Sequence, residues 1–174
     1  MKGMDIHQQL VDLLTAGEAR FRVMEHEAMG KCEAVSEIRG TQLSQGAKAL
    51  VCKVKGNGVK QVVLAVLGAD LQADLSLLAQ HLGGTKASLA SPAEVDELTR
   101  CVFGAIPPFS FHPSLRLVAD PLLFERHDEI AFNAGLLEKS IIMDTTDYLR
   151  LAKPTQIAFH RAASTSASQE TAPQ

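Results

Sequence analysis

The chain has 174 residues, of which 46% are hydrophobic, and its formal net charge is -3. This length suits one domain, and the hydrophobic fraction excludes an intrinsically disordered chain. Aromatic residues make up only 5%, and the charge is mildly acidic. Both features exclude a broad base-stacking platform and a general nucleic-acid coat, although they leave room for a local basic patch.

Cysteine usage and the apolar runs indicate the compartment. Three cysteines are too few, and odd in number, for a secreted disulfide framework, so reduced thiols are expected. The first residues lack the apolar core of a signal peptide, and no apolar run approaches the ~20 residues of a membrane span. We therefore expect a soluble cytoplasmic protein, with neither DNA nor a membrane as partner.

The N-terminal region alternates short helices and strands. Helical spacing of Ile6, Leu10, Leu13 and Leu14 predicts an amphipathic helix that ends at Gly17. Period-two alternation then predicts a strand over residues 21–27. A short helix over residues 32–39 follows, and its inward side chains are expected to be Ala34, Val35 and Ile38.

The clearest local prediction is a β-hairpin. Residues 47–55 and 59–67 are rich in Val and Leu, and Gly56-Asn57-Gly58 joins them. These turn residues tolerate the positive φ angles that a tight hairpin needs.

The C-terminal half predicts further helices and strands. A leucine stripe from Leu71 to Leu82 predicts a helix, and Ser91-Pro92-Ala93-Glu94 has the pattern of a capping box at the start of another. Strands are predicted over residues 86–90, 115–119, 129–133 and 140–143, and a last helix over residues 144–151. The order predicts an α+β fold, a mixed sheet flanked by helices, within residues 1–160. Residues 161–174 have no apolar side chain larger than Ala and are expected to be a disordered polar tail.

Lys48 is a candidate binding residue because of its place in the first hairpin strand. Side chains alternate between faces, so Lys48 shares a face with Leu50, Cys52 and Val54. A lysine that begins an apolar row either extends its ammonium along the surface to water or points it into a pocket. From the residues alone, the first alternative is favoured.

The second candidate is the loop Gly104-Ala105-Ile106-Pro107-Pro108, between Phe103 and Phe109. Glycine permits close approach to a ligand, and prolines stiffen the backbone. Such a loop can hold N–H groups toward a carbonyl oxygen. A rigid connector between elements is the alternative, and the residues alone favour it.

Metal and nucleophile signatures are weak. His26, Cys32 and His112 could meet in space, but close ligand pairs of the usual zinc kind are absent from the sequence. Gly-x-Ser-x-Gly and Gly-x-x-x-x-Gly-Lys-Ser/Thr motifs are also absent. We expect no metal and no cofactor.

Several short motifs together resemble one family. They are His26-Glu27-Ala28, Gly46 to Val51, Val102 to Phe109, Asp120 and Asn133-Ala134-Gly135. In their order and spacing they are similar to the YbaK and prolyl-tRNA synthetase-associated domain family of trans-acting aminoacyl-tRNA deacylases, and most of all to its YeaK-like subgroup. The resemblance covers about His7 to Ala152 and implies a mixed, partly barrel-like sheet with helices around it.

The resemblance also implies an activity, the hydrolysis of the ester that joins a wrong amino acid to tRNA. The family lysine matches Lys48, and the family's Gly-x-x-x-Pro loop matches Gly104 to Pro108. The family uses neither a metal nor a side-chain nucleophile. The resemblance assigns substrate binding to the loop and to four further residues, which are His26, Asp120, Asn133 and Gly135.

The chemistry suggests roles for these residues. Only Gly104, Ala105 and Ile106 of the loop can donate N–H groups to the ester carbonyl, because Pro107 and Pro108 have none. Lys48 would hold the terminal adenosine or its phosphate, and the ribose hydroxyl of the substrate would transfer the proton. A tight apolar pocket predicts small amino acids such as Ser, Ala, Thr or Pro.

Contact with tRNA is expected at the acceptor end only. Five basic residues could form a modest basic rim or be plain solvated surface, namely Lys31, Arg39, Lys53, Lys55 and Lys60. The alternative function is a non-catalytic module that binds aminoacyl-tRNA or a nucleotide and associates with a tRNA synthetase. A metal-dependent hydrolase is a third and weaker alternative.

Overall fold

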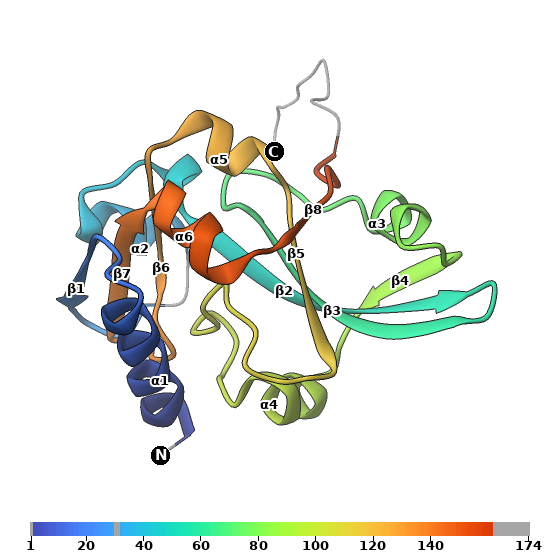
Figure 1. Ribbon diagram of the computed structural model, residues 1–174, viewed down its shortest axis with the longest axis horizontal. Helices are drawn as coiled ribbons and strands as arrows, with labels where there is room; N and C mark the ends of the chain where they lie inside the picture. Colours follow the sequence, from blue (N-terminus) through green and yellow to red (C-terminus); the bar gives the residue numbers. More distant parts are fainter. Residues whose placement is uncertain (1, 30–31, 162–174) are drawn as a thin grey trace.

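The computed structural model describes residues 2–29 and 32–161 and confirms the predicted α+β class (Figure 1). In the described residues, the strands form two sheets, with the orders β1-β7-β6 and β4-β2-β3-β5-β8. A single parallel bridge between Gly46 and Ala131 connects them. The sheet is thus not continuous, and within this part of the chain neither sheet closes into a barrel.

The N-terminal elements cover the smaller sheet. Helix α1 (Lys2–Ala16) and strand β1 (Phe21–Glu25) precede helix α2 (Cys32–Arg39) and the 3-10 turn η1 (Leu43–Gln45). Ile6, Leu10 and Leu14 of α1 are buried, as their helical spacing predicts. Strand β1 pairs antiparallel with β7 along its whole length.

The predicted hairpin is confirmed. Strands β2 (Ala47–Gly56) and β3 (Val59–Gly68) pair antiparallel, with Asn57 and Gly58 at positive φ in the turn. Strand β4 (Lys86–Leu89) pairs only with residues 52–55 of β2. The first residues of β2 therefore have β3 on one side and no β4 on the other.

The remaining elements follow in order. Helices α3 (Leu75–His81) and α4 (Pro92–Thr99) flank β4, and β5 (Leu115–Ala119) runs parallel to β3. The capping box of Ser91 and Glu94 is present at the start of α4. Helix α3 begins later than the leucine stripe because Asp74 caps it by accepting the Leu77 N–H. The chain continues through α5 (Leu122–Arg126), β6 (Glu129–Asn133), β7 (Lys139–Asp144), α6 (Thr145–Ala152) and β8 (Thr155–Gln156).

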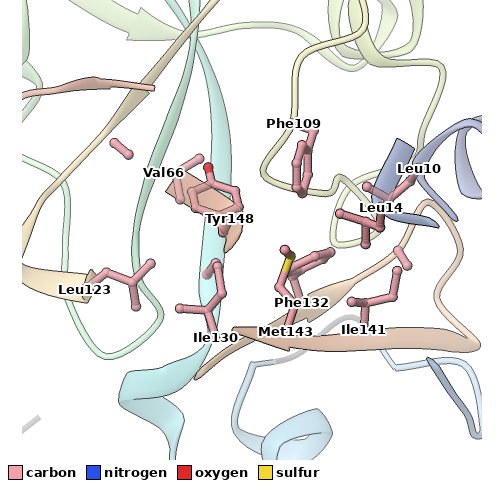
Figure 2. Packing of buried hydrophobic residues seen from close by; sticks show 13 residues of the cluster. Leu10, Leu14, Val66, Phe109, Leu123, Ile130, Phe132, Ile141, Met143 and Tyr148 are labelled. Carbon is pink, nitrogen blue, oxygen red and sulfur yellow. The ribbon is translucent and has the colours of Figure 1, made fainter. Parts of the chain in front are cut away.

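The core between α1, β6, β7 and α6 anchors the proline loop. Figure 2 shows Phe109 at the end of this loop, facing the rings of Tyr148 and Phe132. The Tyr148 hydroxyl donates to the carbonyl oxygen of Pro108 at 2.7 Å. Burial of these rings fixes the C-terminal half of the loop against the core.

Residues 161–174 were expected to be a disordered polar tail. Apart from Arg161, they lie outside the described residues. No helix in residues 2–29 and 32–161 is both long and apolar enough to cross a membrane.

Candidate functional site

A cavity of about 200 Å³ lies where the two sheets meet. Its walls come from α2, from the start of β2, from the end of β6, and from Phe103, Gly104 and Ile106. The cavity exists because β4 does not extend along this half of β2, while β6 approaches it only at the Gly46–Ala131 bridge. Lys48 and Gly104 both line it, so the fold brings together the two motifs predicted as candidates.

Lys48 lies in the third residue position after η1 and is half-buried at the cavity wall. Its ammonium donates to the carbonyl oxygen of Leu71 at 2.6 Å. An ammonium has three donors, so this bond leaves two for a ligand. The side chain is therefore fixed by a backbone carbonyl and is not simply extended into water.

The loop around Gly104 presents fewer donors than the sequence predicts. The N–H of Ala105 already donates to Val102 at 3.0 Å, within a tight turn that places Gly104 at φ +85°. The N–H groups of Gly104 and Ile106 have no acceptor among the described residues. These two N–H groups are therefore the ones available to a carbonyl oxygen.

Asn133 and Gly135 hold this loop from the side of β6. The Asn133 amide donates to the carbonyl oxygens of Gly104 at 2.6 Å and of Met29 at 2.9 Å. Gly135, at φ +89°, donates its N–H to the carbonyl oxygen of Ala105 at 2.8 Å. Asn133 also lines the cavity, whereas Gly135 supports the loop from behind.

A buried polar network continues from Asn133. Its side-chain oxygen accepts from Arg39 at 3.1 Å and from Ser140 at 3.2 Å. Arg39 also donates to the Ser140 hydroxyl at 2.9 Å, and His26 contacts the same hydroxyl at 2.7 Å. His26 is thus connected to the cavity through Ser140 and is not itself in the wall.

Arg39 does not lie on the expected basic rim. Its side chain is only 8% exposed, because α2 turns it inward onto Ser140 and Asn133. Of the other expected rim residues, Lys53 pairs with Glu94 at 3.1 Å. Lys55 and Lys60 are exposed near the hairpin tip, and Lys31 lies outside the described residues.

The inward face of α2 also differs from the predicted one. Val35 is buried as expected, but Ile38 is 38% exposed, and Ser36 and Arg39 are buried in its place. Val35, Ser36 and Arg39 occupy positions i, i+1 and i+4, which is a regular helical face. Helical spacing is consistent with this face. The prediction from apolar residues missed it because two of its three members are polar.

Asp120 lies apart from the cavity wall and binds the C-terminal segment. Its fully buried carboxylate accepts the backbone N–H groups of Leu122, Phe159 and His160, and the His160 ring at 2.7 Å. Burial opposes ionisation, yet the hydrogen bonds from His160, Leu122 and Phe159 hold the pKa of Asp120 below its ordinary value. The structure therefore gives Asp120 a positioning role for residues 159–160.

The candidate nucleophiles and metal ligands do not form a second reaction centre in the described residues. Burial raises the pKa of the Cys52 thiol to about 12 and that of Cys101 to about 11. The described residues contain no group of three or more His, Cys, Asp or Glu side chains that could hold a metal. His112 accepts the Ser114 N–H, and the Cys32 side chain lies outside what the structure describes.

Residues 26–151 match the family described as "Aminoacyl-tRNA editing domain". The chain is 73% identical over 162 residues to the Multifunctional Ser/Thr-tRNA deacylase ProXp-y of Escherichia coli strain K12. This alignment covers 93% of the chain and 97% of that relative.

Solved structures share the fold at low sequence identity. The hypothetical protein APE2540 superposes with a TM-score of 0.77 at 18% identity, over 87% of this chain and 99% of that one. A protein proposed to be a trans-editing enzyme for prolyl tRNA synthetase superposes with a TM-score of 0.75 at 20% identity, over 90% and 97% of the two chains. At these identities the superpositions establish the architecture.

Proposed function

The chain belongs to the aminoacyl-tRNA editing domain family, and we propose that it is a trans-acting deacylase that hydrolyses mischarged aminoacyl-tRNA. The observation that carries this proposal is that Lys48, Gly104 and Ile106 line one cavity. The amino acid would enter this cavity, and the acceptor end of the tRNA would remain outside it.

The cavity supplies what ester hydrolysis needs. Water adds to the ester carbonyl carbon, and the negative charge that develops on the carbonyl oxygen is accepted by N–H donors. Gly104 and Ile106 provide those donors from a loop held in place by Asn133, Gly135 and Tyr148. The bond to the ribose oxygen then breaks, and a proton passes to that oxygen as the amino acid leaves. The neighbouring ribose hydroxyl serves as the proton carrier.

Lys48 positions the substrate. Lys48 lines the cavity, and its ammonium has donors in excess of the single bond to Leu71. A compact positive charge at this place binds the terminal adenosine or its phosphate and fixes the ester beside the loop.

Selectivity follows from the size and polarity of the cavity. About 200 Å³ between Val35, Ile106 and Phe132 suits a small side chain and excludes a large one by steric clash. Ser36 adds a hydroxyl to the wall, and this hydroxyl donates its hydrogen to the carbonyl oxygen of Glu33 at 2.8 Å. It can therefore accept from a substrate hydroxyl. We place Ser and Thr ahead of Ala and Pro as substrates, in agreement with the name of the Escherichia coli relative.

A Lys48→Ala variant tests the proposal. The deacylation rate is measured with tRNAs mischarged with Ser, Thr, Ala or Pro. Lys60→Ala is the control for the loss of an exposed lysine. We expect Lys48→Ala to lose about a hundredfold in kcat/KM because positioning is lost, and Lys60→Ala to retain the wild-type rate.

Two outcomes would contradict the proposal. Wild-type rates in Lys48→Ala would remove the role of this residue. Binding of aminoacyl-tRNA without turnover by the wild-type chain would instead favour a non-catalytic module that associates with a synthetase.

A further inference from the structure

A second cavity, of about 240 Å³, adjoins the first and is a shallower depression, more open to solvent. The two share Lys48 and Leu50 in their walls, so they meet at the first residues of β2. The second cavity is completed by Leu89 of β4, by Arg161, and by Gln72, Ala73 and Leu75, which lie before and at the start of α3.

The charges in this second cavity are all positive. Among the described residues, Lys48 and Arg161 are in its wall, and no carboxylate is. The two nearest acids in the sequence are occupied elsewhere, because Asp70 pairs with Arg126 at 2.9 Å and Asp74 caps α3. No described residue pairs with the Arg161 guanidinium. The cavity therefore has the charge that attracts an anion.

Arg161 is held by the fold although it is the last described residue. Its backbone N–H donates to Gln72 at 2.8 Å, and the preceding residue forms a bridge with Ala73. Asp120 binds residues 159 and 160 through their N–H groups. The backbone of Arg161 is thus fixed, and the residue lines the second cavity.

Apolar side chains form the remaining wall. Leu50 and Leu75 are partly buried there, and Leu89 is 53% exposed. An exposed leucine beside two cations fits a ligand with a flat apolar part and a phosphate, which is the composition of a nucleotide.

We propose that the second cavity binds the terminal nucleotide of the aminoacyl-tRNA, with its 5′-phosphate on Arg161 and its base against Leu89. This inference rests on the proposed function. The ester joins the amino acid to the ribose of this nucleotide, so the nucleotide must lie directly beside the aminoacyl cavity. Lys48 lies at that junction, between the two cavities.

The test measures binding without turnover. Two amide-linked, non-hydrolysable seryl-adenosine probes are titrated by calorimetry, one with and one without a 5′-phosphate. We expect the phosphate to tighten binding to the wild-type chain about tenfold, as a charge-assisted hydrogen bond does. Arg161→Ala should lose this gain, and Arg161→Lys should keep most of it. Arg22→Ala, which removes an exposed arginine of β1, is the matched control and should behave as wild type.

Kinetics on seryl-tRNA provide a second readout. Arg161→Ala should raise KM with little change in kcat, and should reduce the slope of log KM against log salt by about 0.7, the value for one single-strand phosphate contact. Leu89→Ser should raise KM with an unchanged salt slope, because it removes only the contact with the base.

The inference would be overturned if the 5′-phosphate changed the probe affinity equally in the wild-type chain and in Arg161→Ala, or changed it in neither. That result is distinguishable from failure of the proposed function. The amide probes need no catalysis, whereas the proposed function depends on the rate of Lys48→Ala with mischarged tRNA.

Discussion

The Asn133 side-chain amide donates to the carbonyl oxygen of Gly104 at 2.6 Å. This bond connects the end of β6 to the loop whose Gly104 and Ile106 line the cavity. Asn133 is itself oriented by Arg39, which donates to its side-chain oxygen at 3.1 Å. The loop conformation, with Gly104 at φ +85°, is therefore set by a buried polar network as well as by its own prolines.

Replacing Asn133 by Asp tests this positioning role. The substitution keeps the shape and removes the donor to Gly104 and Met29, while Arg39 gains a carboxylate partner. We expect kcat for seryl-tRNA to fall about 10- to 100-fold with a smaller change in KM, because the N–H donors lose their alignment. Steady-state kinetics on mischarged tRNA measure the effect.

Asn57→Asp is the matched control, because it makes the same change at the exposed hairpin tip. It should leave kcat unchanged. Should Asn133→Asp retain the wild-type kcat, the hydrogen bond to Gly104 has no part in aligning the loop.

Local signals in the sequence predicted much of this architecture. The Gly56-Asn57-Gly58 turn and the Ser91–Glu94 capping box depend on neighbouring residues alone, and both are present. Lys48 and the Gly104–Pro108 loop were candidates from their own segments, but the residues alone favoured a solvated lysine and a rigid connector. The family resemblance supplied their functional roles. Their common cavity follows from the fold.

The supporting contacts were not predictable in the same way. Arg39 bonds to Ser140 across 101 residues of sequence, and Asp120 to His160 across 40. Each is a charged side chain that is buried only because the fold provides partners for it. Without the partner in view, such a residue is assigned to the surface, as Arg39 was.

Ser36→Ala tests how the cavity distinguishes hydroxylated amino acids. Ser36 is buried in the wall, with its hydrogen on Glu33, so its oxygen is free to accept from a substrate hydroxyl. A neutral hydrogen bond contributes about 1 kcal/mol, so we expect kcat/KM for seryl- and threonyl-tRNA to fall about fivefold and that for alanyl-tRNA to stay the same.

The measurement is the ratio of deacylation rates for seryl- and alanyl-tRNA in one enzyme preparation. Ser76→Ala, on the exposed face of α3, is the control and should leave the ratio unchanged. An equal decrease for both substrates in Ser36→Ala would mean that the residue supports α2 and does not recognise the hydroxyl.

Asp120→Asn tests the buried carboxylate that holds the C-terminal segment. Because hydrogen bonds keep the folded-state pKa of Asp120 below its unfolded value, its ionisation stabilises the fold above the unfolded pKa of about 3.9. That contribution is lost as the pH falls through the folded-state pKa. At pH 7 we expect the free energy of unfolding to decrease by about 2 kcal/mol in the variant, the magnitude of a hydrogen bond to a charged group.

Urea unfolding at pH 7 and at successive values below pH 4 measures this effect. The difference in free energy of unfolding between the wild-type chain and Asp120→Asn should decrease as the wild-type carboxyl gains its proton. Asp5→Asn, at an exposed acid of α1, is the control and should differ little from the wild type in stability at any pH. Asp120 also fixes the residues that precede Arg161, so the variant should lose part of the tighter binding that the 5′-phosphate gives. A variant with a pH-independent loss of stability would show that the carboxylate acts through packing, and that its charge contributes nothing.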